Sequence, residues 1–147
     1  MLKKDFIYRK ISLMQEDLTK LSELAKFSFS EIVEDFYKQN TLERLLEKII
    51  IRAVDINQHI LLELATKDTN APKNYKETFT ELAKINVYPK EFSENISKSV
   101  GTRNILVHEY DDEEVNYNKI YDSVSDCLKD YHQYCNYILK FTEGIVS

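Results

Sequence analysis

Only two glycines and two prolines interrupt this chain of 147 residues. Tight turns between strands depend on these two residues, whereas the interiors of helices exclude them. Their scarcity therefore favours long helices joined by short loops and argues against a many-stranded sheet. Because the chain is long enough to bury a core of its own, we expect residues 1–147 to form a single all-α domain.

Apolar residues recur at helical spacing through most of the chain. Residues 5–26 carry one apolar stripe with polar residues opposite, which predicts a first amphipathic helix. Ser28 and Ser30 offer caps for a second helix, and the poor helix formers in residues 39–41 predict a kink or a brief break there. The stripe of the first helix consists of Ile7, Ile11, Met14, Leu18 and Leu21.

Residues 42–66 have the most apolar helical pattern of the chain. A helix this apolar lies at the centre of a bundle or is shared with a second subunit. Asp55 and His59 are polar exceptions, one turn apart on the same face. They either bond to each other locally or line one groove with His108. The apolar positions are Leu42, Leu45, Leu46, Ile49, Ile50, Ala53, Val54, Ile56, Ile60, Leu61 and Leu64.

The second half of the chain continues the helical pattern after a polar loop at residues 67–74. We expect a short helix over residues 75–85, another that Pro89 opens and that runs on into residues 101–111, and a last one over 114–142. The acidic residues 111–114 favour the start of that last helix. The whole pattern predicts an antiparallel bundle of four to six helices.

Composition narrows the classes of function. The formal net charge is −5, so the chain lacks the basic excess that gives sequence-independent nucleic-acid binding. Cys127 and Cys135 form no zinc-type cluster, and we interpret both as reduced, buried thiols. No long apolar run or signal peptide is present, which predicts a soluble, cytoplasmic protein. Nothing in the sequence calls for a metal or another cofactor.

The clearest chemical pattern lies in residues 101–111. Arg103 is followed by Asn104, by His108 and by Tyr110. Arginine presents a planar fork to phosphate oxygens, and histidine titrates near neutral pH, which suits proton transfer. On a regular helix Asn104 and His108 lie about 40° apart, whereas Arg103 lies about 140° from His108 and about 20° from Tyr110. Asn104 is therefore placed to orient the imidazole or to share its ligand.

This set of side chains suits cleavage of RNA without a metal. A base removes the 2′-hydroxyl proton, the oxygen attacks phosphorus, an acid protonates the leaving 5′-oxygen, and arginine stabilises the charge of the transition state. One histidine cannot be base and acid in the same step. A two-fold dimer that brings two copies of His108 into one cleft supplies both. Judged by spacing alone, an Arg and a His near a helix end are more often an ion pair or a cap than a catalytic pair.

The run Arg103-Asn104-Ile105-Leu106-Val107-His108-Glu109-Tyr110 resembles the R-x4-H-x-Y motif of HEPN-domain toxins of the HepT type. The similarity extends to the first amphipathic helix, to the long helix that contains Asp55 and His59, and to the closing helix. It implies a dimerising HEPN-like bundle and a metal-independent endoribonuclease that cleaves RNA, with tRNA as one candidate. Arg103 and His108 would be the catalytic pair, and Asn104, Asp55 and His59 supporting residues.

The resemblance also implies a partner. Toxins of this type pair with a minimal nucleotidyltransferase, an MntA-type antitoxin, which transfers AMP to the motif tyrosine in a type VII-like toxin–antitoxin pair. That tyrosine is Tyr110 here. A phosphate bound to Tyr110 would place negative charge beside Arg103 and block the cleft.

Two other functions stay open at the level of sequence. Related helical domains act as non-catalytic binding partners of nucleotidyltransferases, and in those the Arg–His pair need not be kept. A purely structural helical dimer is the third alternative, in which substitutions at Arg103, His108 and Tyr110 change only stability.

Overall fold

The computed structural model is a bundle of α-helices. It describes residues 1–64, 66–67, 69–108 and 117–145, and the side chains of residues 104–108 and 117 fall outside that description. These ranges contain seven helical segments and no strand. The helices are α1 (Lys4–Leu24), α2 (Phe29–Glu34), α3 (Phe36–Leu64), α4 (Tyr75–Lys84), α5 (Lys90–Ser97), α6 (Ser99–His108) and α7 (Tyr117–Gly144). The all-α prediction is confirmed.

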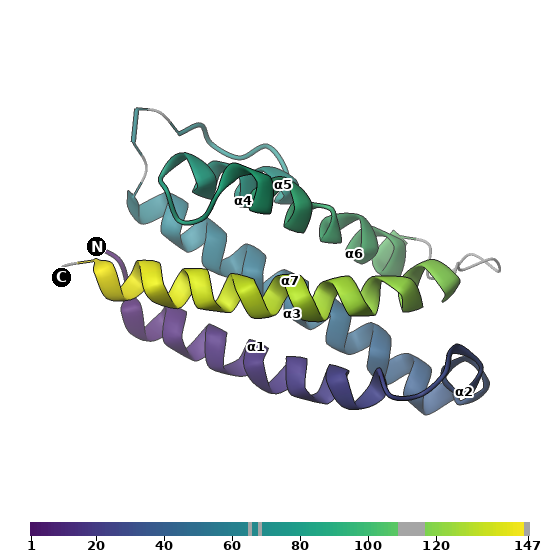
Figure 1. Cartoon of the computed structure of the whole chain (residues 1–147). Helices are drawn as coiled ribbons and strands as arrows, with labels where there is room; N and C mark the ends of the chain where they lie inside the picture. Colours follow the sequence, from purple (N-terminus) through teal and green to yellow (C-terminus); the bar gives the residue numbers. More distant parts are fainter. Residues whose placement is uncertain (65, 68, 109–116, 146–147) are drawn as a thin grey trace.

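Three long helices and one segmented arm make up the bundle (Figure 1). Helix α1 packs against both α3 and α7, and α3 also contacts α4 and α6. Figure 1 shows α4, α5 and α6 together along one side of the bundle and α1 along the other. Both chain termini lie at the same end, where the Lys4 ammonium donates to the carbonyl oxygen of Ile145 over 2.5 Å.

Helix α3 is the centre of the bundle. It contacts α1, α2, α4, α6 and α7, and its apolar positions from Leu42 to Leu61 are buried. The broad apolar surface of residues 42–61 is therefore buried within one protomer. This confirms the interpretation that residues 42–66 form the central helix of the bundle. No helix within the described ranges is long and apolar enough to cross a bilayer.

Of the kink or brief break predicted at residues 39–41, the break is wrong. Helix α3 runs through them and begins at Phe36, because the carboxylate of Asp35 accepts the backbone N–H groups of Tyr37 at 3.0 Å and Lys38 at 3.2 Å. Aspartate is a strong helix cap, whereas the weak propensity of Asn40 and Thr41 is overridden by packing. The cap predicted at Ser28 is confirmed, since its hydroxyl accepts the N–H of Glu31 at 3.2 Å.

The helix expected after Pro89 is two helices, α5 and α6, which meet at Lys98. This division raises the number of segments above the four to six predicted. Serine hydroxyls recur around the junction and donate to carbonyl oxygens three residues earlier, Ser97 to Glu94 at 2.8 Å and Ser99 to Ile96 at 2.7 Å. Such bonds compete with the helical backbone ladder and favour a change of direction.

Candidate active site

Helix α6 carries the Arg–His motif and is anchored at its first turn. The hydroxyls of Ser99 and Tyr131 lie 2.6 Å apart, which ties α6 to α7, and Val100 is buried in the core. The next turn of α6 brings Arg103 to the same side as Ser99, since residues four apart lie about 40° apart on a helix. The start of the motif is thus held by the bundle.

Arg103 is half-buried and lies over an aromatic ring. The central carbon of its guanidinium is 5.0 Å from the centroid of the Tyr75 ring, at the start of α4. Its Nε atom is buried and has no hydrogen-bond partner, and no ion pair joins Arg103 to any residue in the described part of the chain. A guanidinium that lacks a carboxylate partner keeps its charge available to a ligand.

The other motif residues are described less fully. Asn104 and His108 belong to α6, so their backbone positions fit the predicted separation of about 40°. Their side chains fall outside the described atoms. Tyr110 and the acidic residues 111–114 lie outside the described residues altogether, and their predicted roles stay predictions.

Asp55 and His59 contact α1 and the residue before it, whereas Arg103 contacts α4. The carboxylate of Asp55 pairs with the Lys10 ammonium of α1 at 3.2 Å, and Nε2 of His59 accepts the backbone N–H of Lys3 at 3.1 Å. The His59 ring also packs against Phe6, with centroids 4.9 Å apart. Both residues therefore face α1, and none of their described contacts involves α4 or α6. Their bonds lead to α1 rather than to each other.

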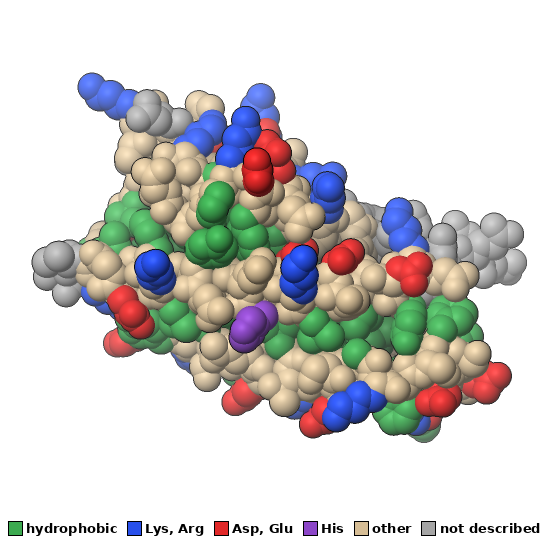
Figure 2. All heavy atoms as spheres, viewed as in Figure 1, with side chains coloured by type: hydrophobic (Ala, Val, Ile, Leu, Met, Phe, Trp, Pro, Cys, Tyr) green, Lys and Arg blue, Asp and Glu red, His purple; other side chains and the backbone are tan. Residues whose placement is uncertain are grey.

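The α7 side of α6 is acidic. Thr102 lines a hollow of about 110 Å³ together with Lys98, Asp126 and Asp130. Burial, followed by the charge of Asp126, raises the pKa of Asp130 above its usual value, and Asp130 accepts a hydrogen bond from Asn95 at 3.1 Å. On the face drawn in Figure 2, basic and acidic side chains alternate, so this face offers no continuous basic stripe for a nucleic acid.

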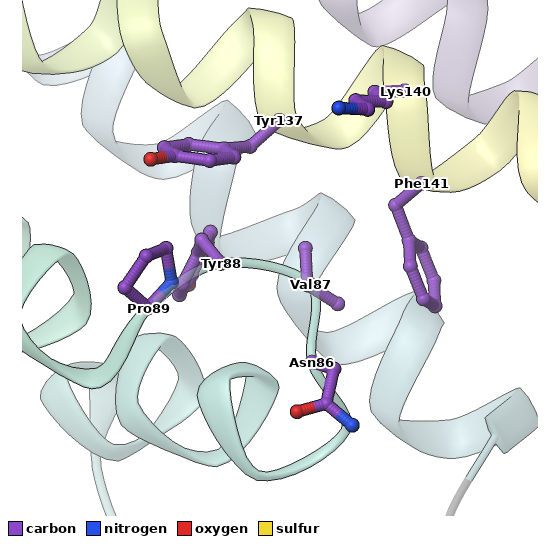
Figure 3. Close-up of a pocket in the computed structure, with 7 residues that line it drawn as sticks. All are labelled: Asn86, Val87, Tyr88, Pro89, Tyr137, Lys140 and Phe141. Atoms are coloured by element: carbon purple, nitrogen blue, oxygen red, sulfur yellow. The ribbon is translucent and has the colours of Figure 1, made fainter.

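A larger hollow of about 450 Å³ lies at the α4–α5 turn, against the second half of α7. Figure 3 shows Tyr137, Lys140 and Phe141 of α7 facing Val87, Tyr88 and Pro89 of the turn. Its lining contains neither a histidine nor an arginine, so the acid–base residues of the motif are not there.

The two cysteines are free and buried, as predicted. Burial raises the pKa of Cys135 to about 12 and that of Cys127 further still, where the charges of Asp130 and Asp126 add to the effect. A thiol held neutral at physiological pH is a poor nucleophile. Among the described residues, no group of three His, Cys, Asp or Glu side chains could hold a metal ion.

The sequence matches a known family over most of its length. A family model described as ribonuclease HepT-like covers residues 14–138. The chain belongs to this family. The resemblance seen in residues 103–110 is thereby confirmed at the level of the whole domain.

Individual members of the family agree with this assignment. The chain is 35% identical over 132 residues to tRNA nuclease HepT of Aphanizomenon flos-aquae, covering 90% of this chain and 86% of that protein. It is 28% identical over 134 residues to mRNA nuclease HepT of Shewanella oneidensis, covering 91% and 96%. The solved structure of a tri-AMPylated Shewanella oneidensis HEPN toxin in complex with MNT antitoxin is also similar. It matches with a TM-score of 0.79 and 27% identity, over 92% of this chain and 98% of that one.

Proposed function

We propose that this protein is an RNA-cleaving toxin in which Arg103 and His108 are the catalytic pair. The observation that supports this most directly is the placement of both residues on α6, with the Arg103 guanidinium free of any carboxylate among the described residues. Relatives named as a tRNA nuclease and an mRNA nuclease add weight to RNA as the substrate.

In the proposed reaction His108 moves the protons and Arg103 binds the phosphate. The imidazole takes the 2′-hydroxyl proton, the 2′-oxygen attacks phosphorus, and the 5′-oxygen leaves with a proton from a second acid. Arg103 stabilises the charge that develops on the phosphate oxygens. Asn104, one turn before His108, orients the imidazole. We give Asp55 and His59 no part in this reaction, because their described contacts lead to α1 and to Lys3 immediately before it.

The second acid is a second copy of His108, contributed by a homodimer. Arg103 and His108 are about 140° apart on their helix, and the contact with Tyr75 directs Arg103 toward α4. One protomer is therefore poorly arranged to place both side chains on one phosphate. A two-fold axis beside α6 places two motifs in one cleft.

We further propose that a partner nucleotidyltransferase of the MntA type controls the toxin by transferring AMP to Tyr110. A related toxin is tri-AMPylated and bound to MNT antitoxin. Each AMP on the tyrosine adds a phosphodiester with one negative charge, together with a nucleoside. Beside Arg103 this group would compete for the guanidinium and obstruct the cleft.

Expression without the antitoxin tests the catalytic pair. We expect the wild-type protein to arrest growth, and the Arg103→Ala and His108→Ala variants to permit it. The purified variants should cleave cellular RNA at least about 100-fold more slowly than wild type, because a positioned acid–base group and a donor that stabilises transition-state charge each contribute that much. Cleavage by the wild type should persist in EDTA.

His132→Ala is the matched control, because His132 is exposed on α7. It should remain toxic. Equal growth with wild type and with His108→Ala would reject the nuclease proposal. Tight binding to the transferase without RNA cleavage would then identify a non-catalytic binding partner.

The mass of the intact protein tests whether AMP transfer regulates the toxin. After incubation with the nucleotidyltransferase and ATP, the protein should gain the mass of one or more AMP groups and lose RNA cleavage. The Tyr110→Phe variant should gain none. A gain that survives Tyr110→Phe would reject this tyrosine as the site.

A further inference from the structure

Tyr75 is the residue that the described structure places against the proposed phosphate-binding arginine. The Arg103 guanidinium lies 5.0 Å from the centroid of the Tyr75 ring. Both side chains are half-buried, and Tyr75 also packs against the hydrophobic core. A cation over a ring face is attracted by the ring quadrupole, and the attraction grows as water is excluded.

The ring takes the place that a carboxylate partner often has beside a half-buried arginine. The Arg103 Nε–H is buried without an acceptor, and the described residues supply no carboxylate to the guanidinium. A carboxylate there would fix the side chain but neutralise the charge that a phosphate needs. An aromatic face holds the guanidinium without neutralising it and, apart from the buried Nε–H, leaves its N–H groups to the ligand.

Tyr75 is itself held by a chain of buried hydrogen bonds. Its carbonyl oxygen accepts the Thr78 hydroxyl at 2.6 Å, and the Thr78 oxygen accepts the side-chain amide of Asn57 at 3.2 Å. The Asn57 oxygen accepts the Tyr134 hydroxyl at 2.6 Å. This chain joins the first turn of α4 to α3 and α7. A satisfied buried network is rigid, so the backbone that carries the ring is fixed, and the ring itself packs against the core.

The start of α4 is fixed from the loop side as well. The side-chain oxygen of Asn74 accepts the backbone N–H of Glu77 at 2.9 Å, which caps the helix immediately before Tyr75. Helix α4 therefore begins at a set residue, and Tyr75 occupies its first position.

We propose that Tyr75 is a positioning residue for RNA cleavage, whose ring face holds the Arg103 guanidinium in the orientation that binds the scissile phosphate. The inference rests on the proposed nuclease function. It assigns the role to the ring and not to the phenol hydroxyl. Because Arg103 covers one face of the ring, stacking of an RNA base on that same face is excluded.

Kinetics of three variants test the proposal. Tyr75→Leu should lower kcat by about five- to thirtyfold with little change in KM, since the arginine stabilises charge that develops in the transition state. Tyr75→Phe, which keeps the ring, should recover most of that loss. Tyr137→Leu is the matched control: Tyr137 is a half-buried tyrosine that packs against Tyr88 and Phe92 beside the hollow of Figure 3. The Tyr137→Leu variant should have the same kcat per folded molecule as wild type.

A double-mutant cycle separates positioning from simple loss of stability. Tyr75→Leu should lower the urea midpoint of unfolding more in the wild type than in the Arg103→Ala variant, because only the wild type has the contact to lose. Equal shifts of the urea midpoint in the wild type and in Arg103→Ala would show that Tyr75 and Arg103 do not interact in solution.

The outcomes also distinguish this inference from the function on which it rests. If wild type cleaves RNA and His108→Ala does not, but Tyr75→Leu keeps its kcat or Tyr75→Phe fails to recover it, the positioning role alone is rejected. If wild type cleaves no RNA, the nuclease proposal fails and the positioning role fails with it.

Discussion

His59 is a histidine whose surroundings require it to be neutral. Its Nε2 accepts the Lys3 backbone N–H at 3.1 Å, which needs a free lone pair, and its ring packs against Phe6. Burial lowers the pKa of His59 below its ordinary value. The positive charges of Lys3 and the N-terminus act in the same direction, while Glu63 opposes them. Protonation therefore breaks one of the bonds that hold the chain before α1, alongside the ion pair of the N-terminus with Glu63.

This lowered pKa predicts a loss of stability in mild acid. Below about pH 6.5, the ordinary pKa of histidine, the unfolded chain binds a proton at this position that the folded chain does not. The free energy of unfolding then decreases as pH falls toward the lowered folded pKa. The His59→Gln variant keeps an acceptor and does not titrate, so it should lack this step.

Urea midpoints between pH 5 and 8 measure the effect. The midpoint of wild type relative to His59→Gln should fall on acidification, and the other two histidines cancel because both proteins contain them. Curves that stay parallel would show that His59 has no shifted pKa in the folded state.

Among the elements, α1 and α3 are joined by ion pairs at two aspartates that differ in burial, Asp17 and Asp55. Asp17 of α1 is 2% exposed and pairs with Arg52 and, at 3.5 Å, with Lys48 of α3. The second aspartate, Asp55, pairs with Lys10, and its side chain is 41% exposed. Removing one partner of a buried pair leaves an uncompensated charge, whereas an exposed pair contributes little.

Neutralising the two aspartates should therefore have unequal effects. Asp17→Asn should lower the free energy of unfolding by about 1–3 kcal/mol, less than for a fully buried pair because Lys48 and Arg52 can turn toward water. Asp55→Asn, the matched control on the same helix pair, should change it by less than about 0.5 kcal/mol. Urea denaturation of both variants measures the difference, and equal losses would contradict the role of burial.

The elements also show how far a sequence can predict this fold. Regular apolar spacing predicted α1, α3 and α7 closely, because burying an apolar stripe dominates their stability. The breaks were less predictable. The cap at Asp35 outweighs the weak helix formers that follow it, and the junction at Lys98 depends on serine hydroxyls whose direction a sequence does not reveal.

The residues of the candidate site likewise divide into those that the sequence predicts and those that it does not. Arg103 and His108 belong to a local motif, so the sequence alone could point to them. Tyr75 escapes sequence-based prediction because it lies in another helix, and only the packing of the bundle brings its ring to Arg103. Asp55 and His59 show the converse. Their spacing left open a bond between the two or a groove shared with His108, but the described contacts of both lead to α1 and to Lys3 immediately before it.

At the scale of the whole molecule, the proposed chemistry depends on a dimer that one protomer does not display. Most of the apolar surface of α3 is buried inside the bundle, and its exposed Phe36, Tyr37 and Leu62 lie near its two ends. The apolar pattern of α3 therefore does not by itself require a second subunit. The argument for one is chemical: a single His108 cannot be base and acid in one step, and its position on α6 diverges from that of Arg103.

Mixed dimers test whether two copies of His108 serve one cleft. When wild type and His108→Ala are co-expressed in equal amounts and pair at random, about one-quarter of the dimers carry two intact histidines. If both histidines are needed, RNA cleavage should fall to about one-quarter of that of the same total amount of wild type. If each protomer works alone, it should fall only to about one-half.

Two controls make this measurement decisive. Co-expression with His132→Ala, in which an exposed histidine of α7 is removed, should cost no activity, and a different affinity tag on each copy should recover the mixed dimers. Activity of about one-half at confirmed random pairing would overturn the two-histidine cleft and leave one His108 per site. A protein that sediments as a monomer while cleaving RNA would overturn it as well, since no second copy would then be present to supply the acid.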